Sequence, residues 1–343
     1  MVIAVPASSP LTIICPFHNN RNSMKALVTG AAGFIGSYLV ETLKERGYDV
    51  TCLARGSSNL KWIEHLGLKF IICDLADIES RADEIAGFDY IFHIAGVTKG
   101  LCERDFFHVN ADCTEKLVRV AAERGSGLKR FIYLSSLAAI GPSRNGTAVR
   151  EDSPALPVSY YGRSKLQGEK AVFQYRNKCP VTIIRPPAVY GPRDTDFFVM
   201  FKMIKKGVFP FWGKCFYSLL HVEDLVRGIV LAAEKKEAEG EIFFLSDDMV
   251  YTNEDIAAEI SAAIGVKAMK IRLPQSLLPL LGFVGQKIDK KGIINRDRIN
   301  DFRYSNWTCD SSKAKNELGF RSRIMLREGI KWTADWYRIH RWL

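Results

Sequence analysis

The chain has 343 residues, of which 47% are hydrophobic and 25% charged, and its formal net charge is +10. These values are typical of a globular protein with one large domain or two modest ones. The Lys and Arg residues are scattered along the sequence rather than clustered among aromatic residues, which argues against nucleic-acid binding. The positive balance instead favours small anionic ligands, such as a phosphorylated cofactor.

Residues 1–23 differ from the rest and are expected to form a disordered extension. Neither the apolar run at 11–15 nor the run at 277–284 is long enough to span a bilayer. No basic segment precedes the first run, so a secretory signal is not expected. The second run could line an apolar pocket or make a peripheral contact with a membrane. The eight Cys form no C-x-x-C pair and none pairs with a His at metal-ligand spacing, so we expect no metal site and a cytoplasmic location.

The first motif lies between Lys25 and Gly47. A short apolar run, 26–28, is followed by a glycine-rich turn and by a helical pattern that ends at Gly47. A strand, a glycine turn and a helix bind a pyrophosphate, because the backbone approaches the ligand closely and the helix start offers free N–H groups. The spacing is G-x-x-G-x-x-G rather than the usual G-x-G-x-x-G, and an ordinary turn is the alternative. The residues expected to hold the cofactor here are Gly30, Gly33, Phe34, Ile35 and Gly36.

The pattern that follows alternates strands with helices, which predicts a doubly wound parallel sheet of the Rossmann type. Strands are expected at 25–29, 49–54, 69–73, 89–94, 129–134, 180–185 and 241–245. Helices are expected at 34–46, 103–125, 161–176, 223–234 and 253–264. After Arg185 the sequence becomes rich in Pro, Gly and aromatic residues. We therefore assign 24–186 and 221–264 to the Rossmann domain, and 187–220 and 265–343 to a smaller, mostly helical substrate lobe.

The end of the second strand carries no carboxylate that could accept a hydrogen bond from the ribose of NAD. Arg55 stands there instead, followed by Ser57, and a guanidinium suits a phosphate. We therefore expect NADP(H) as the cofactor, with NAD(H) as the alternative. An ordinary exposed Arg in a loop would give the same sequence pattern. Asp74 and Leu75, after the third strand, are expected near the adenine, and Asp74 could equally be a plain turn residue.

A proton-transfer unit is predicted from three side chains. Tyr161 and Lys165 are four residues apart and share one face if 161–176 is helical. A phenol has a pKa of about 10, and a nearby ammonium pulls that pKa toward neutrality. Ser136, at the end of the fifth strand, could hydrogen-bond the same substrate oxygen.

Taken together, these motifs resemble the extended short-chain dehydrogenases/reductases, which include epimerases, dehydratases and ketone reductases. The resemblance covers about residues 24–343. Its motifs are 29–36 (TGAAGFIG), 93–96 (HIAG), 109–110 (VN), 135–136 (SS), 161–165 (YGRSK) and 185–192 (RPPAVYGP). It implies that Ser136, Tyr161 and Lys165 are catalytic, with Lys165 on the ribose hydroxyls, and that Asn110 supports them. It also implies cofactor contacts from Ala95, Gly96, Ser135, Pro187, Ala188 and Val189.

Softer motifs, such as 51–55 (TCLAR) and 133–141 (YLSSLAAIG), resemble the dihydroflavonol reductase and 3β-hydroxysteroid dehydrogenase branch. This favours an NADP(H)-dependent oxidoreductase acting on a ketone or alcohol of a steroid-, flavonoid- or lipid-like molecule. Phe201 and Phe216, in the aromatic segment, are the expected substrate contacts, although such residues are more often core. The alternatives are a nucleotide-sugar epimerase or dehydratase and a non-enzymatic cofactor sensor. By the same resemblance, helices 103–125 and 161–176 would form a homodimer.

Overall fold

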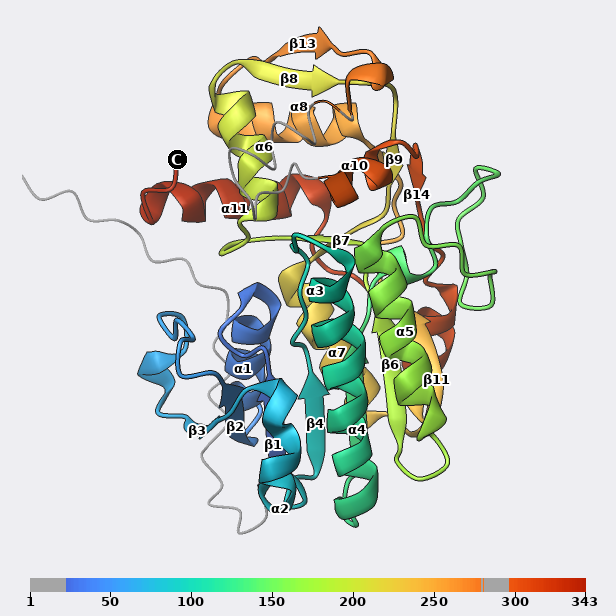
Figure 1. The fold of residues 1–343 in the computed structure, drawn as a ribbon. Helices are drawn as coiled ribbons and strands as arrows, with labels where there is room; N and C mark the ends of the chain where they lie inside the picture. Colours follow the sequence, from blue (N-terminus) through green and yellow to red (C-terminus); the bar gives the residue numbers. More distant parts are fainter. Residues whose placement is uncertain (1–22, 279, 281–295) are drawn as a thin grey trace, which may run out of the picture.

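The computed structural model describes residues 23–278, 280 and 296–343, and it is built around a seven-stranded parallel sheet (Figure 1). The strand order is β11-β6-β5-β4-β1-β2-β3, so the chain runs outward from β1 to β3 and then crosses back to β4. A doubly wound sheet opens a crevice at this switch point, beyond the carboxyl ends of its strands. The strands are β1 (Lys25–Thr29), β2 (Asp49–Ala54), β3 (Lys69–Ile72), β4 (Tyr90–His93), β5 (Arg130–Leu134), β6 (Val181–Arg185) and β11 (Glu241–Phe244). The expected Rossmann fold is confirmed.

Helices cover both faces of this sheet because its strands are apolar on both sides. In β1, Ala26 and Val28 pack in one hydrophobic cluster, whereas Leu27 points to the other. The first cluster lies under α1 (Phe34–Glu45) and α7 (Val222–Glu234). The second lies under α2 (Ala82–Ile85), α4 (Cys113–Arg124) and α5 (Tyr160–Gln174). Ahead of α4, α3 (Glu103–Phe107) continues into a π-helical turn at His108–Asp112.

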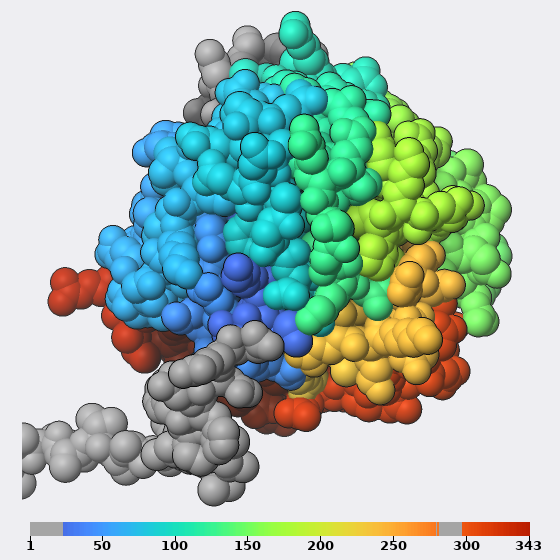
Figure 2. Space-filling model, turned by 90° about the horizontal axis from the view of Figure 1, so that it is seen from below, coloured from blue at the N-terminus to red at the C-terminus, as the bar shows by residue number. Residues whose placement is uncertain are grey.

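The end of the sheet opposite the crevice is closed by the loops that precede the strands. Seen from below, the segment near residue 125 and the gold segment near residue 235 lie next to each other (Figure 2). Arg130, at the start of β5, joins them, since its guanidinium donates a hydrogen bond to the Lys235 carbonyl at 3.0 Å. Among the described residues, no helix combines the length and the apolar character needed to cross a membrane.

A second lobe lies over the carboxyl ends of the strands (Figure 1). Its helices are α6 (Asp196–Lys205), α8 (Asn253–Ile264), α10 (Arg296–Phe302) and α11 (Leu326–Ile339), and β8 (Val208–Phe211) pairs in parallel with β13 (Met269–Arg272). Two small sheets join the lobes: β7 (Ala188–Tyr190) with β10 (Leu219–His221), and β9 (Phe216–Tyr217) with β12 (Tyr251–Thr252) and β14 (Asn306–Trp307).

One expected boundary needs correction, because the sequence assigns 221–264, and with it α8, to the Rossmann domain. In the structure its apolar face, with Ile256, Ala257 and Ile260, packs in the core of the second lobe together with Phe201 and Ile330. The helical period was visible in the sequence, but the surface that this helix buries was not. Residues 1–22, 279 and 281–284 lie outside the described residues, so the expectations of a disordered extension and of a membrane contact at 277–284 stay predictions.

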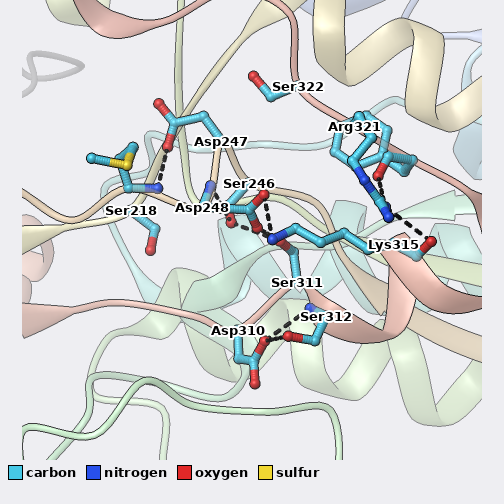
Figure 3. Close-up of polar contacts among 12 residues, drawn as sticks. Ser218, Ser246, Asp247, Asp248, Asp310, Ser311, Ser312, Lys315, Arg321 and Ser322 are labelled. Carbon is cyan, nitrogen blue, oxygen red and sulfur yellow. Dashed lines mark hydrogen bonds and ion pairs between the residues drawn. The ribbon is translucent and has the colours of Figure 1, made fainter.

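A polar junction ties the segment after β11 to the C-terminal part of the chain. Figure 3 shows Ser246, Asp248, Ser311 and Lys315 close together. The Lys315 ammonium pairs with the Asp248 carboxylate at 2.6 Å, Ser311 donates a hydrogen bond to the same carboxylate, and the Ser246 and Ser311 hydroxyls lie 3.1 Å apart. Lys315 belongs to a π-helical turn, Ala314–Leu318, whose Ala314 and Leu318 pack in the core beneath α1 and α7.

Asp247, in the same segment, gives stability an unusual dependence on pH. Its carboxylate accepts hydrogen bonds from the Met249 amide and the Tyr251 hydroxyl, and burial raises its pKa to about 7. In the unfolded chain the pKa of an Asp carboxyl group is about 4. Because the folded state holds this proton more tightly, the free energy of unfolding falls as pH rises between the two pKa values, by at most about 1.4 kcal/mol per pH unit.

We therefore expect Asp247→Asn to flatten the fall in the free energy of unfolding between pH 5 and pH 7. Urea denaturation of both proteins at several pH values would measure this difference, because effects of other titrating groups cancel in the comparison. Asp255→Asn, at an exposed helix start, is the control. Parallel curves for wild type and Asp247→Asn would contradict the expectation.

Candidate active site

A cavity of about 830 Å³ runs between the carboxyl ends of the strands and the second lobe. The glycine turn lies at one end of the cavity and residues of the second lobe at the other. All but two of the expected cofactor and catalytic residues line it. The two exceptions are Asn110 and Ser57, whose neighbour Ser58 lines the cavity instead. Of the expected substrate contacts, Ser136 and Tyr161 line the cavity, whereas Phe201 and Phe216 do not.

The glycine turn is shaped for close approach of a ligand. Gly30 has φ +69°, a backbone conformation that residues other than glycine rarely adopt. A Cβ at Gly36 would lie only 2.1 Å from the Gly30 carbonyl oxygen. The helix α1 begins directly after Gly33, and no side chain of the described residues caps its first turn. Its first-turn N–H groups therefore face the cavity with no acidic neighbour, which fits the pyrophosphate of a dinucleotide.

Gly36→Ala is expected to destabilise the protein by about 1–3 kcal/mol and to weaken cofactor binding, because the new methyl group meets backbone rather than a movable side chain. Thermal unfolding and cofactor titration would measure both effects. Gly87→Ala is the matched control, since a Cβ there meets nothing closer than 3.9 Å. Equal behaviour of the two variants would contradict the close packing of the turn.

The end of β2 provides a separate subsite. Arg55 is exposed and lines the cavity, and its backbone N–H donates to the Ser58 hydroxyl at 3.1 Å. This Ser58 contact shapes the turn that follows β2. Asp74 and Leu75 also line the cavity, and the Asp74 carboxylate accepts a hydrogen bond from the Ala76 amide at 3.0 Å. Asp74 thus caps the short helix that follows it, which agrees with the alternative that Asp74 is a plain turn residue.

A buried ion pair fixes the strand end that carries Ser136. Arg185, at the end of β6, makes two hydrogen bonds to the Glu169 carboxylate of α5, at 2.8 and 2.6 Å. Ser135 donates to the same carboxylate at 2.5 Å. Bidentate pairing of this kind is rigid as well as strong. It holds β5, β6 and α5 in one arrangement, and so sets the position of Ser136, whose hydroxyl also accepts from the Ala138 amide at 3.1 Å.

Tyr161, Ser136 and Lys165 all line the cavity. Burial raises the pKa of the Tyr161 phenol, while a hydrogen bond with Ser136 and the positive charge of Arg298 act in the opposite direction. Lys165 is buried, and its ammonium donates to the Leu134 carbonyl at 2.7 Å and lies over the Tyr133 ring. Burial lowers the pKa of Lys165 to about 7. The sequence predicted Lys165 as the positive charge that helps Tyr161, and it did not predict Arg298.

Asn110 lies behind the cavity wall, in the π-helical turn, and is fully buried. Its amide group pairs with the backbone of Val97 in both directions: Nδ2 donates to the carbonyl at 2.9 Å and Oδ1 accepts from the N–H at 2.8 Å. Nδ2 also donates to Ser164 of α5 at 2.9 Å. Asn110 therefore joins the loop after β4 to the catalytic helix, and this is a supporting position rather than one in contact with a substrate.

The far end of the cavity combines aromatic and charged residues. Phe197, Tyr217, Phe302 and Trp307 supply aromatic surface. Lys99 is paired with Asp196 at 2.7 Å, and Arg298 with Asp301 at 3.9 Å. Phe197 and Tyr217 belong to the segment after Arg185 that is rich in aromatic residues, whereas no sequence pattern places Phe302 of α10 or Trp307 of β14 at the cavity.

The two expected substrate contacts do not reach this cavity. Phe201 is fully buried in the core of the second lobe, where it packs edge-on against Tyr337. Phe216 is half-buried in β9 and does not line the cavity, whereas its neighbour Tyr217 does. Because side chains alternate along a strand, a choice between adjacent residues of β9 cannot be made without its pairing partners.

A parallel sheet with a glycine-rich turn at its switch point, together with a Ser, a Tyr and a Lys around one cavity, defines the class of short-chain dehydrogenases/reductases. Residues 26–245 match the NAD dependent epimerase/dehydratase family, and the chain belongs to that family. The expected resemblance is confirmed.

Relatives extend over nearly the whole chain. A 3-beta-hydroxysteroid dehydrogenase from Mycolicibacterium neoaurum is 30% identical, with 91% of each chain covered. A ceramide reductase from Caulobacter vibrioides is 29% identical, over 92% of this chain and 95% of the relative. The solved UDP-glucose 4-epimerase from Thermotoga maritima has a TM-score of 0.76 at 23% identity, over 92% of this chain and 99% of that one, and it supports the fold alone.

Proposed function

We propose that the protein is an NADP(H)-dependent oxidoreductase that reduces a ketone of a hydrophobic small molecule or oxidises the corresponding secondary alcohol. The observation that carries this proposal is the aromatic lining of the cavity beside Ser136 and Tyr161, formed by Phe197, Tyr217, Phe302 and Trp307. Apolar walls with a few convergent polar groups suit a lipophilic substrate. The steroid dehydrogenase and the ceramide reductase among the relatives support the same substrate class.

The chemistry follows from the positions of the three side chains. When bound, the nicotinamide cofactor supplies the hydride that adds to the carbonyl carbon. Tyr161 donates its phenolic proton to the carbonyl oxygen, and Ser136 hydrogen-bonds to that oxygen. Lys165 would bind the ribose hydroxyls and keep a positive charge near the phenolate that remains. For alcohol oxidation, Tyr161 takes up the proton instead.

The proposed preference for NADP(H) depends on Arg55. Arg55 is exposed directly after β2 and lines the cavity, as does Ser58. No carboxylate follows β2 directly, since residues 55–59 read RGSSN. A 2′-phosphate would find a bidentate donor at this point, whereas the ribose of NAD would find no acidic acceptor.

The test is cofactor turnover followed by absorbance at 340 nm. Purified protein would be supplied with NADPH, and in parallel with NADH, and with steroid ketones, dihydroflavonols or long-chain 3-oxo compounds. Consumption of NADPH in proportion to alcohol formed would support the proposal. Conversion of a nucleotide sugar to its epimer without net cofactor loss would instead identify an epimerase and overturn the substrate class.

We also propose a homodimer in which α4 and α5 of two copies pack together. Both helices lie on one face of the sheet, and none of the described elements forms a further layer over their outer sides (Figure 1). Light scattering coupled to size-exclusion chromatography would give the mass in solution. A mass of one chain would contradict this arrangement.

A further inference from the structure

The helix that carries Tyr161 has an unusual start. An α-helix leaves its first N–H groups without partners inside the helix, and side chains normally supply them. At α5, the local cap is Ser159, whose hydroxyl accepts from the Gly162 amide at 3.2 Å. This cap leaves the amides of Tyr160 and of Tyr161 itself to find acceptors elsewhere.

Those acceptors come from the second lobe. Asp297 of α10 accepts a hydrogen bond from the Tyr160 amide at 2.6 Å with one carboxylate oxygen, and from the Tyr161 amide at 3.2 Å with the other. The two partners are separated by 137 and 136 residues in the chain. Figure 1 shows α10 above the end at which α5 begins. Asp297 is buried, with a relative exposure of 9%, so its two hydrogen bonds are shielded from competing water.

The same short helix also faces the cavity. Arg298 and Asp301 line the cavity with Tyr161, and Phe302 adds to its aromatic wall. The Asp301 carbonyl accepts from the Trp307 indole at 3.1 Å, which ties α10 to β14. One element of the second lobe therefore touches the substrate space and at the same time holds the backbone of the proton donor.

We propose that Asp297 is a positioning residue, which aligns the Tyr161 phenol for proton transfer by fixing the first turn of α5 to the second lobe. Proton transfer depends steeply on the position of the donor, and a misplacement of about 1 Å can lower a rate by about 100-fold. Acid/base efficiency then depends on the docking of α10. This inference rests on the proposed function insofar as Tyr161 is the proton donor.

The test compares Asp297→Ala, which removes both acceptors, with Asp297→Asn, which keeps one. We expect kcat to fall at least about tenfold in Asp297→Ala and less in Asp297→Asn, while the dissociation constant of NADPH changes less than twofold. Hydrogen exchange of the peptide that spans 158–166 should become faster in the same order. Exchange measures the anchoring of α5 without requiring turnover.

Asp255→Ala is the matched control, because Asp255 also accepts hydrogen bonds at a helix start of the second lobe, from Thr252, the residue before α8, and does not line the cavity. It should leave kcat and exchange at 158–166 unchanged. An unchanged kcat in Asp297→Ala would overturn the proposal. A fall in kcat would also overturn it if the loss of stability fully explains the fall and Asp255→Ala shows the same fall. If no ketone is reduced by the wild type, the proposed function fails, and the exchange comparison still decides whether Asp297 holds α5.

Discussion

Replacing Tyr161 by Phe is expected to lower kcat for carbonyl reduction by about 10²- to 10⁴-fold, the usual contribution of a positioned acid or base. The phenol lines the cavity together with Ser136, and the ring of Phe fills the same partly buried space. The variant therefore loses the transferable proton and little else. The dissociation constant of NADPH, measured by fluorescence titration, should stay close to that of the wild type.

Tyr160→Phe provides the matched control for this experiment. Tyr160 is the preceding residue of α5 and does not line the cavity, and its ring packs against the Arg163 guanidinium at 4.7 Å. We expect its kcat to remain within a factor of about two, because no proton-transfer step passes through it. A Tyr161→Phe enzyme with wild-type kcat would show that another group supplies the proton.

Replacing Arg55 by Asp is expected to lower kcat/KM with NADPH by about 10- to 100-fold and to improve it with NADH. A charged hydrogen bond contributes about 1.5–3 kcal/mol, and each 1.4 kcal/mol corresponds to tenfold. The carboxylate repels a 2′-phosphate and could accept from a free ribose hydroxyl. Steady-state rates with both cofactors and one ketone would measure the change in preference.

The control for Arg55→Asp is Arg124→Asp at the end of α4, which makes the same change of charge on an exposed side chain outside the cavity. It separates a local contact from the general effect of lowering a net charge of +10. Arg55→Asp would contradict the proposed subsite if it left the ratio of kcat/KM for NADPH to that for NADH unchanged.

The sheet could be predicted from the sequence because its strands are short, apolar and regularly spaced. The predicted bounds 25–29 and 49–54 coincide with β1 and β2, and the other five strands agree within a residue at each end. The predicted helix 103–125 is helical throughout nearly its whole length, but a π-helical turn at 108–112, which contains Asn110, separates α3 from α4. The periodic pattern of apolar residues in the sequence does not distinguish this π-helical turn from an uninterrupted α-helix.

The second lobe could not be predicted to the same extent, because its contacts join segments that are far apart in the chain. The helix α11 was missed, although Ile330 and Tyr337 pack in the core of this lobe. Phe201 and Phe216 were chosen as substrate contacts from composition alone, and composition does not give the direction of a side chain. Asp297 illustrates the limit most clearly, since its partners lie more than a hundred residues away.

The order of segments in the second lobe has a practical consequence for protein engineering. Its main elements come from 196–211, 251–272 and 296–302, and from α11 at 326–339, while the intervening α7, β11 and 314–318 pack with the sheet. A single crossover in a chimeric gene would therefore bring mismatched halves of the substrate cavity together. Transfer of substrate preference between relatives requires exchanging these segments as a set, with Asp297 retained opposite the start of α5.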